Sequence, residues 1–411
     1  MKRIAVIGAG YAGLAAAVEL AAAGCHVEVF EASRTLGGRA RAVELDGMTV
    51  DNGAHILVGA YRETLRLMEK VGADRTALRK QALHLEFPGH IKITAPRLPA
   101  PLHLGWALLT AHGLNWQEKL AAIRFMRALK KARFRLPRDI TAKQLIANQP
   151  LAVRRFLWEP LCLAALNTPV KAASAQVFLN VLRDSLAADR AASDLLLPAT
   201  DFSSLFPEPA ARFIEAHGGK VHRSTRVHSL DALADFDHHI LAVAPYHLPA
   251  LAPQIAIPDF VWQPIATIYL RYPATVRLAF PMLGMASGHG QWVFDRGALC
   301  GQHGLLAVVI SGTGPWQTLD HAALAHAMHT EIAAIVPDLP PPSRHWVIED
   351  KRATFACTPG LARPTTATAL PNVWLAGDYV AGDYPATLEG AVRSGVAAAQ
   401  SILREPSRHQ A

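Results

Sequence analysis

The chain has 411 residues, of which 51% are hydrophobic and 18% charged, and its formal net charge at pH 7 is +8. This length predicts two or three units with a substantial core, and the apolar content excludes a disordered chain. The four cysteines are scattered, without a CxxC pair or the spacing of metal ligands. We therefore expect no disulfide framework, no metal site and a reducing, cytoplasmic location.

The N-terminal segment carries the first chemical signal. Residues 4–7, Ile-Ala-Val-Ile, predict a short strand that leads directly into Gly8, Gly10 and Gly13, spaced as G-x-G-x-x-G. A helix of small residues follows, and a second predicted strand ends at Glu31. In such a unit the glycines allow a tight turn, a close approach to a pyrophosphate and close packing of helix on strand, while the acid can accept hydrogen bonds from ribose hydroxyls. The segment predicts a Rossmann-like α/β fold that binds a dinucleotide.

The segments that follow the first unit indicate which dinucleotide is bound. Gly37, Gly38 and Arg39 lie just beyond the ribose acid. They resemble the second fingerprint of the FAD-containing amine oxidase and phytoene desaturase superfamily, in which the paired glycines let the loop pass close to the cofactor. Residues 218–230 resemble the later strand pair of that superfamily, in which the backbone of Val227 would contact the adenine.

Two further segments near the C-terminus agree with this resemblance. Gly377 and Asp378 resemble the motif whose acid holds the ribityl and pyrophosphate part of FAD. Leu388, Gly390 and Ala391 open a helix that, in the superfamily, directs its N-terminus at the flavin ring, where the helix dipole stabilises negative charge. Since the segments occur in the superfamily's order and no second G-x-G-x-x-G is present, the resemblance implies FAD as the cofactor and no separate NAD(P)H domain.

The cofactor motifs are interrupted by segments that lack them. We expect a discontinuous Rossmann-like FAD-binding domain and an interleaved α+β substrate-binding domain, the first part of which is helical and basic. The substrate domain is apolar with few charges, as a long hydrocarbon substrate would require. The predicted FAD-binding segments are 1–84, 205–250 and 355–411, and the substrate segments are 85–204 and 251–354, with strands expected near 265–270, 291–294 and 305–310 and a helix near 319–335.

A basic amphipathic helix is predicted at residues 119–138, where eight lysines and arginines alternate with apolar residues. Such a helix attracts anionic surfaces, but no nucleic-acid-binding module accompanies it. It is either a solvated helix with its apolar side packed inward or a peripheral contact with the inner face of a membrane, which the apolar stretch 91–116 would reinforce. No run of eighteen apolar residues predicts a transmembrane helix.

A closer resemblance covers nearly the whole chain. Residues 51–61, 157–185 and 305–311 resemble the squalene-associated FAD-dependent desaturases of bacterial hopanoid pathways, also called hydroxysqualene dehydroxylases. The resemblance implies reduction of hydroxysqualene, a long isoprenoid alcohol, to squalene. This chemistry needs an acid that helps the hydroxyl leave, a hydride from reduced flavin and a pocket that excludes water. No segment indicates which partner supplies the electrons to the flavin.

His55 is the leading candidate for the acid. It follows the turn at residues 51–53, which by resemblance brings the chain toward the flavin ring, and imidazole can be protonated near neutral pH. The alternative is a structural histidine that bonds to the backbone or to the cofactor. Asp383, Tyr384 and Tyr61 are further candidates.

Other functions compete with this interpretation. A carotenoid-type desaturase would use the same fold and cofactor but would remove hydride from a polyene. An amine oxidase would need a cage for an ammonium group, which the apolar segments do not offer. A prenyl-binding escort protein would lack redox chemistry, and its cofactor motifs would be expected to decay.

Overall fold

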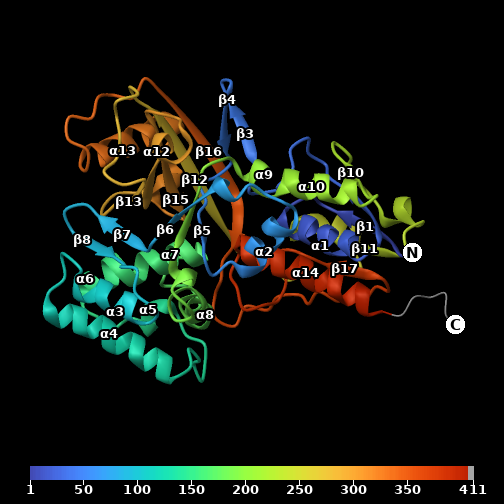
Figure 1. Ribbon diagram of the computed structural model, residues 1–411, viewed down its shortest axis with the longest axis horizontal. Coiled ribbons are helices and arrows are strands. Elements are labelled where there is room, and N and C mark those ends of the chain that lie inside the picture. Colours follow the sequence, from blue (N-terminus) through green and yellow to red (C-terminus); the bar gives the residue numbers. More distant parts are fainter. Residues whose placement is uncertain (406–411) are drawn as a thin grey trace.

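The computed structural model describes residues 1–405, so residues 406–411 of the third predicted FAD-binding segment lie outside it. A five-stranded parallel sheet forms one end of the molecule, on the right of Figure 1, with strand order β10-β2-β1-β11-β17. Its strands are β1 (Arg3–Ile7), β2 (His26–Phe30), β10 (Lys220–His222), β11 (His238–Leu241) and β17 (Val373–Leu375). This arrangement confirms the predicted Rossmann-like α/β fold.

Helices made of small residues cover this sheet. Helix α1 (Tyr11–Ala22) packs against α14 (Leu388–Arg404), and a Cβ atom on Gly395 would lie 2.0 Å from the carbonyl oxygen of Ala12. The two helices therefore approach each other at backbone distance, which only glycine at this position permits. The helices α2 (Arg62–Lys70), α9 (Phe202–Leu205), α10 (Pro207–Ala216) and α11 (Leu248–Leu251) complete this end of the molecule.

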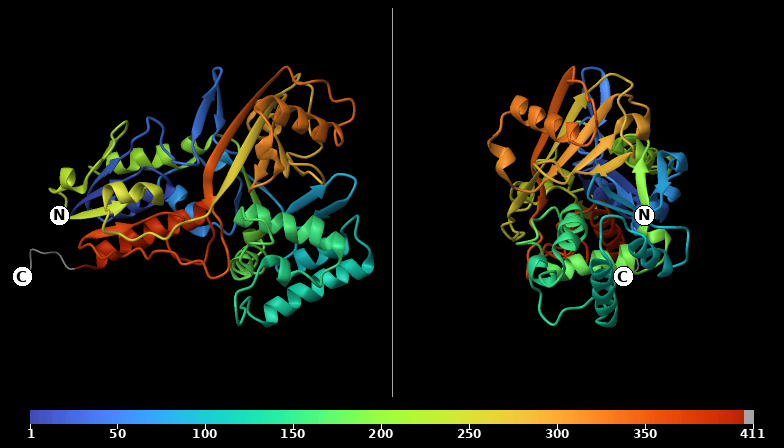
Figure 2. Two further views of the ribbon diagram at one scale, coloured as in Figure 1. Left: turned by 180° about the vertical axis from the view of Figure 1, so that it is seen from behind. Right: turned by 90° about the vertical axis from the view of Figure 1, so that its left-hand side faces the viewer.

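The other end has two parts, seen above and below each other on the left of Figure 1 and from behind in Figure 2. The upper part is an antiparallel sheet of order β13-β14-β15-β12-β16, on which α13 packs. The strands and the helix predicted in the second substrate segment are thereby confirmed. These elements are β12 (Trp262–Arg271), β13 (Met282–Gly284), β14 (Trp292–Asp295), α12 (Arg296–Cys300), β15 (Leu305–Ser311), α13 (His321–Ala333) and β16 (Arg344–Phe355).

The lower part is helical, as predicted. Helix α4 begins and ends earlier than the predicted basic helix 119–138. A capping box between Asn115 and Glu118 sets its start, and positive φ angles of 53° at Arg133 and 55° at Phe134 end it. The helices of this part are α3 (Leu102–Leu109), α4 (Trp116–Lys131), α5 (Ala142–Leu145), α6 (Leu151–Val153), α7 (Glu159–Leu166) and α8 (Ala175–Leu186).

Three small antiparallel sheets complete the fold. Strand β9, from the first predicted substrate segment, pairs with β5 and β6 from the first predicted FAD-binding segment, so a shared sheet lies at this proposed boundary. The division of the chain into two domains stays a prediction. The small sheets are β3 (Ala42–Leu45) with β4 (Met48–Asp51), β5 (Leu57–Val58) with β9 (Leu195–Pro198) and β6 (Leu78–Gln81), and β7 (His84–Phe87) with β8 (Ile91–Thr94).

Candidate active site

A cavity of about 920 Å³ runs from the Rossmann-like unit to the antiparallel sheet and the helices α7 and α8. We call the part lined by the glycine motifs the cofactor end and the part lined by α7, α8 and the second sheet the substrate end. Most of the residues predicted for the site lie in its wall, whereas Gly13, Gly390 and Asp383 do not. The predicted residues that line it are Gly8, Gly10, Glu31, Gly38, Arg39, His55, Tyr61, Val227, Gly377, Asp378, Tyr384, Leu388 and Ala391.

The three glycines of the first motif have different tasks. Gly8 has a φ angle of +107°, and a Cβ atom there would lie 2.5 Å from the carbonyl oxygen of Ala242. A Cβ atom on Gly13 would lie 2.0 Å from the carbonyl oxygen of Gly8. A Cβ atom on Gly10 would instead meet nothing closer than Gly38 Cα at 4.0 Å, so it would project into the cavity. Gly8 and Gly13 thus permit the turn and the packing, and Gly10 leaves room for a ligand at the N-terminus of α1.

Glu31 is held at the end of β2 by backbone donors. The N–H groups of Ala9 and Ser33 each donate to its carboxylate at 2.8 Å. Val227 also lies in the cavity wall, but the predicted strand pair is wrong, because only β10 forms a strand. A positive φ angle of 52° at Ser224 turns the chain directly after β10, and Val227 lies in an irregular segment.

An ion pair joins two cofactor motifs that are far apart in the sequence. Arg39 Nη2 donates to Asp378 Oδ1 at 2.5 Å, and Arg39 Nη1 donates to the carbonyl oxygen of Ala353 at 2.7 Å. Burial opposes the charge of Arg39, but the carboxylate of Asp378 outweighs it and raises the pKa of the guanidinium. The pair therefore fixes the Gly-Gly-Arg loop, the C-terminal motif and β16 relative to one another.

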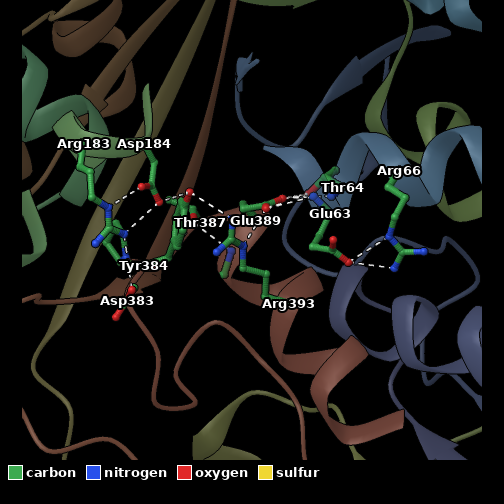
Figure 3. A network of polar contacts seen from close by, with 12 residues as sticks. Glu63, Thr64, Arg66, Arg183, Asp184, Asp383, Tyr384, Thr387, Glu389 and Arg393 are labelled. Atoms are coloured by element: carbon green, nitrogen blue, oxygen red, sulfur yellow. Dashed lines mark hydrogen bonds and ion pairs between the residues drawn. The ribbon is translucent and has the colours of Figure 1, made fainter. Parts of the chain in front are cut away.

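The start of α14 is tied to the start of α2 by a buried acid (Figure 3). Glu389 is fully buried, and its carboxylate accepts hydrogen bonds from the backbone N–H groups of Glu63 (3.1 Å) and Thr64 (3.0 Å) and from the Thr64 hydroxyl (2.8 Å). Arg393 Nε donates to it at 2.8 Å. Glu389 thus caps a helix more than 300 residues earlier in the chain. Sequence reasoning missed this role because no local signal marks it.

The candidates Tyr384 and Asp383 belong to a polar network between α8 and α14 (Figure 3). The Tyr384 hydroxyl donates to Asp184 Oδ2 at 2.9 Å, and Arg183 Nε donates to Asp184 Oδ1 at 2.6 Å. Burial opposes ionisation of Asp184, but these two hydrogen bonds outweigh it and lower its pKa. Burial raises the pKa of Tyr384, so its hydroxyl stays protonated. Asp383 is exposed and contacts Arg183 at 3.5 Å, outside the cavity.

His55 lies beyond the end of β4 and lines the cavity. Its Nδ1 lies 2.6 Å from the carbonyl oxygen of Gly53, and its ring packs on Phe202 with centroids 5.1 Å apart. Because a carbonyl oxygen can only accept, Nδ1 carries the proton of a neutral ring and Nε2 is left as an acceptor. Burial and the nearby charge of Arg39 lower the pKa of His55, which favours this neutral form.

The substrate end of the cavity is predominantly hydrocarbon. A second cavity of about 280 Å³ adjoins it and shares Ala164, Trp292 and Ser311 with its wall. Within residues 1–405, no group of three or more His, Cys, Asp or Glu side chains could hold a metal ion. The apolar residues that line the substrate end include Leu161, Ala165, Phe178, Val181, Leu182, Ile265, Met282, Phe294 and Val309.

The residues at the cofactor end fit FAD. The space beside Gly10 can admit a pyrophosphate at the N-terminus of α1, and Glu31 can accept from ribose hydroxyls. The N-terminus of α14, where the Thr387 hydroxyl accepts from the N–H of Gly390 at 3.1 Å, supplies a positive dipole end in the same cavity.

Comparisons with known proteins agree with this geometry. The family model of the flavin containing amine oxidoreductases matches residues 11–403. A hydroxysqualene dehydroxylase from Sinorhizobium fredii is 28% identical over 98% of this chain and 99% of its own, and a zeta-carotene desaturase from Synechocystis is 26% identical over 99% and 98%. The structure of an oxidoreductase from Methanosarcina mazei superimposes with a TM-score of 0.72 at 16% identity, covering 98% of this chain and 100% of that one. The chain belongs to the flavin-containing amine oxidoreductase family and is an FAD-dependent oxidoreductase.

Proposed function

We propose that this protein reduces hydroxysqualene to squalene in an FAD-dependent dehydroxylation that serves squalene and hopanoid synthesis. The observation that supports this most is the main cavity, which joins residues that fit FAD to a long apolar section. Relatives named hydroxysqualene dehydroxylase match almost the full length of the chain at 28% identity. Carotene desaturases, which also act on long isoprenoids, match at 26% identity or less.

The reaction replaces a hydroxyl group by hydrogen. The C–O bond breaks, the oxygen takes up a proton and leaves as water, and a hydride completes the new C–H bond. That hydride is the chemistry that reduced FAD would supply when bound. The contribution of the chain at this end is to hold the cofactor, through Gly10, Glu31 and the pair of Arg39 with Asp378.

The substrate end binds the hydrocarbon and excludes water, which would otherwise return the alcohol. Burial of one methylene group contributes ~0.8 kcal/mol, so ten of them contribute on the order of 8 kcal/mol. A single hydrogen bond contributes roughly 1 kcal/mol net. The apolar wall therefore determines the affinity for the hydrocarbon substrate, and the polar groups determine the orientation of that substrate.

Of the two roles considered for His55, the geometry favours the structural histidine that bonds to the backbone. The ring donates from Nδ1 to Gly53 and its lowered pKa favours the neutral form, so it offers the cavity an acceptor at Nε2. Tyr384 holds α8 to the start of α14 through Asp184, and Asp383 lies outside the cavity. The catalytic roles of His55, Tyr384 and Asp383 stay predictions.

The test of this function uses the FAD-loaded protein after chemical reduction under anaerobic conditions. Incubation with hydroxysqualene should reoxidise the flavin and form one squalene for each flavin reoxidised. A carotenoid desaturase would instead reduce its oxidised flavin when given a carotene precursor and would leave hydroxysqualene unchanged. Reduced protein that forms no squalene would exclude the proposed reaction.

We also propose that the enzyme works at an anionic membrane surface. Helix α3 and the start of α4 expose four large apolar side chains, which we call the α3/α4 face: Leu102 (60%), Trp106 (55%), Leu109 (40%) and Trp116 (62%). No helix among residues 1–405 is both long and apolar enough to cross a bilayer. The α3/α4 face would therefore insert shallowly into the interface rather than span it.

The charge beside the α3/α4 face supports an anionic partner. Arg124, Arg127, Lys130 and Lys131 are exposed on α4, and none of them forms an ion pair with a carboxylate among the described residues. Each cation near an anionic bilayer contributes about 1 kcal/mol. Helix α4 also contacts α3 and α6 directly, so the cations and the apolar side chains belong to one group of packed helices.

Sedimentation with vesicles tests this contact. The protein should bind vesicles that contain anionic phospholipid and remain free with purely zwitterionic ones. Trp106→Ser together with Leu109→Ser should weaken the binding about tenfold or more, since two exposed apolar side chains are lost. Val261→Ser, at a 69% exposed site outside this face, is the matched control. Equal binding of the double variant and the parent would exclude this face as the contact.

A further inference from the structure

The wall of the main cavity contains a buried polar pair that the reaction described above leaves unused. Asn167 ends α7, and Thr354 lies near the end of β16. Both residues line the main cavity, and they are only 6% and 7% exposed. Asn167 Nδ2 donates to Thr354 Oγ1 at 2.8 Å, which holds the two side chains together across 187 positions of the sequence.

The hydrogen-bonding capacity of this pair is incomplete. The Oδ1 atom of Asn167 is buried and has no partner within residues 1–405. The Thr354 hydroxyl accepts one hydrogen bond from Asn167, and no described acceptor receives its own proton. Buried polar groups in proteins are normally paired, so each unpaired one needs an explanation. The pair offers one free acceptor and one free donor at adjacent positions.

These two free groups match one functional group in particular. An aliphatic alcohol has one O–H donor and an oxygen that accepts, so a single hydroxyl would use both. We propose that Asn167 and Thr354 form the subsite for the hydroxyl of a long-chain isoprenoid alcohol: the substrate O–H donates to Asn167 Oδ1, and the Thr354 hydroxyl donates to the substrate oxygen. The proposal rests on the proposed function and names the residues that recognise the departing group.

The position of the pair is suited to this role. Thr354 directly follows Ala353, whose carbonyl oxygen accepts from Arg39 of the cofactor motif. The subsite therefore adjoins the cofactor end, while the substrate end supplies hydrocarbon for the rest of the ligand. A pure hydrocarbon would leave both polar groups unpaired, whereas the alcohol satisfies them, so the pair would favour the substrate over its own dehydroxylated product.

The backbone conformation of Asn167 restricts which residues can replace it, independently of the proposed hydrogen bond to its side chain. Its φ of 45° and ψ of 31° are left-handed, a conformation that asparagine and glycine tolerate at the end of a helix. Asn167→Gly keeps that backbone and removes the carboxamide. Thr354→Val removes the hydroxyl at nearly constant volume. These two substitutions test the hydrogen bonds with the smallest change to the fold.

The experiment measures the binding of hydroxysqualene and of squalene to the oxidised, FAD-loaded protein, in which no reductive turnover occurs, by the change each ligand causes in flavin absorbance. The parent protein should prefer the alcohol. Each variant should lose about fivefold in affinity for the alcohol and almost nothing for squalene, which corresponds to one hydrogen bond. The double variant should lose less than the product of the two single losses, because both groups serve one hydroxyl.

Thr267→Val is the matched control. The Thr267 hydroxyl is also buried and unpaired among the described residues, but the residue does not line the main cavity. This variant should keep the parent's ratio of alcohol to hydrocarbon affinity. A parent protein without preference for the alcohol, or variants that lose both ligands equally, would overturn the subsite. The variants could lose the preference while the reduced parent protein forms no squalene. That result would uphold the subsite and reject the proposed reaction.

Discussion

The two ends of the cavity bind their ligands in different ways. At the cofactor end, backbone groups and charges are fixed by contacts that allow almost no displacement. At Gly13, for example, an added Cβ atom would lie only 2.0 Å from the carbonyl oxygen of Gly8. At the substrate end, apolar side chains from α7, α8 and the antiparallel sheet form a wall in which only a few polar groups lie. A charged dinucleotide needs hydrogen-bonding partners at fixed positions, whereas a flexible hydrocarbon needs a large apolar contact area from which water is excluded. We therefore expect substitutions at the cofactor end to have larger and more specific effects.

The largest effect is expected from Gly13→Ala. The added Cβ would overlap the Gly8 carbonyl, so α1 must shift away from the loop that receives the pyrophosphate. We expect loss of bound flavin and a fall in activity of up to roughly 100-fold, since overpacking of this kind costs up to ~3 kcal/mol. Gly105→Ala is the matched control, because a Cβ atom there would meet nothing within 4 Å. Flavin absorbance of the purified proteins measures the outcome, and full flavin content in Gly13→Ala would contradict the expectation.

Asp378→Asn should have the next largest effect. It removes the charge that Arg39 faces at 2.5 Å and leaves a half-buried guanidinium without its counter-charge. Hydrogen bonds to charged groups contribute ~1.5–3 kcal/mol, so the affinity for FAD should fall roughly 10- to 100-fold. Arg62→Leu, which removes the exposed pair with Asp189, should change it very little. Titration of each apoprotein with FAD measures the affinities of the two variants and of the parent. Equal affinities of Asp378→Asn and the parent would show that the Arg39 pair does not position the cofactor.

Ile265→Ala tests the substrate end. It removes three carbon atoms from the cavity wall, which should cost about 2 kcal/mol of hydrocarbon binding, or roughly 30-fold in substrate affinity. The flavin content should not change, because Ile265 lies in the second sheet. A rise in KM with unchanged flavin content would separate the two ends of the cavity. Loss of flavin in this variant would contradict that separation.

The smallest effect is expected from the pH dependence of His55. Burial lowers the pKa of its folded form below its ordinary value of about 6.5, so the unfolded chain takes up this proton more readily. The stabilisation is present above that value and is lost as the pH falls below it. His55→Gln should remove this part of the acid sensitivity and retain FAD. Denaturation midpoints at pH 5 and pH 7.5 measure the difference, and an identical pH dependence in both proteins would leave His55 without this role.

The cofactor end could be predicted from the sequence to a greater extent than the substrate end. The strand, the G-x-G-x-x-G turn, the helix and Glu31 lie within about thirty consecutive residues, and local geometry alone places them together. The strand pair expected around Val227 and the bounds of the basic helix were less well predicted. In both regions a positive φ angle, at Ser224 and at Arg133, ended or interrupted the expected element. Neither serine nor arginine is a residue type that predicts a positive φ angle.

The amino-acid sequence by itself determined the Rossmann-like fold, the FAD motifs and the apolar character of the substrate segments, because each depends on residues close together in the chain. Only the tertiary structure decided which distant groups meet. It joined Arg39 to Asp378, Glu389 to the start of α2, and Asn167 to Thr354, and it placed Asp383 outside the cavity. Such pairs form when secondary elements pack, and a hydrogen bond between residues hundreds of positions apart has no local pattern that could predict it.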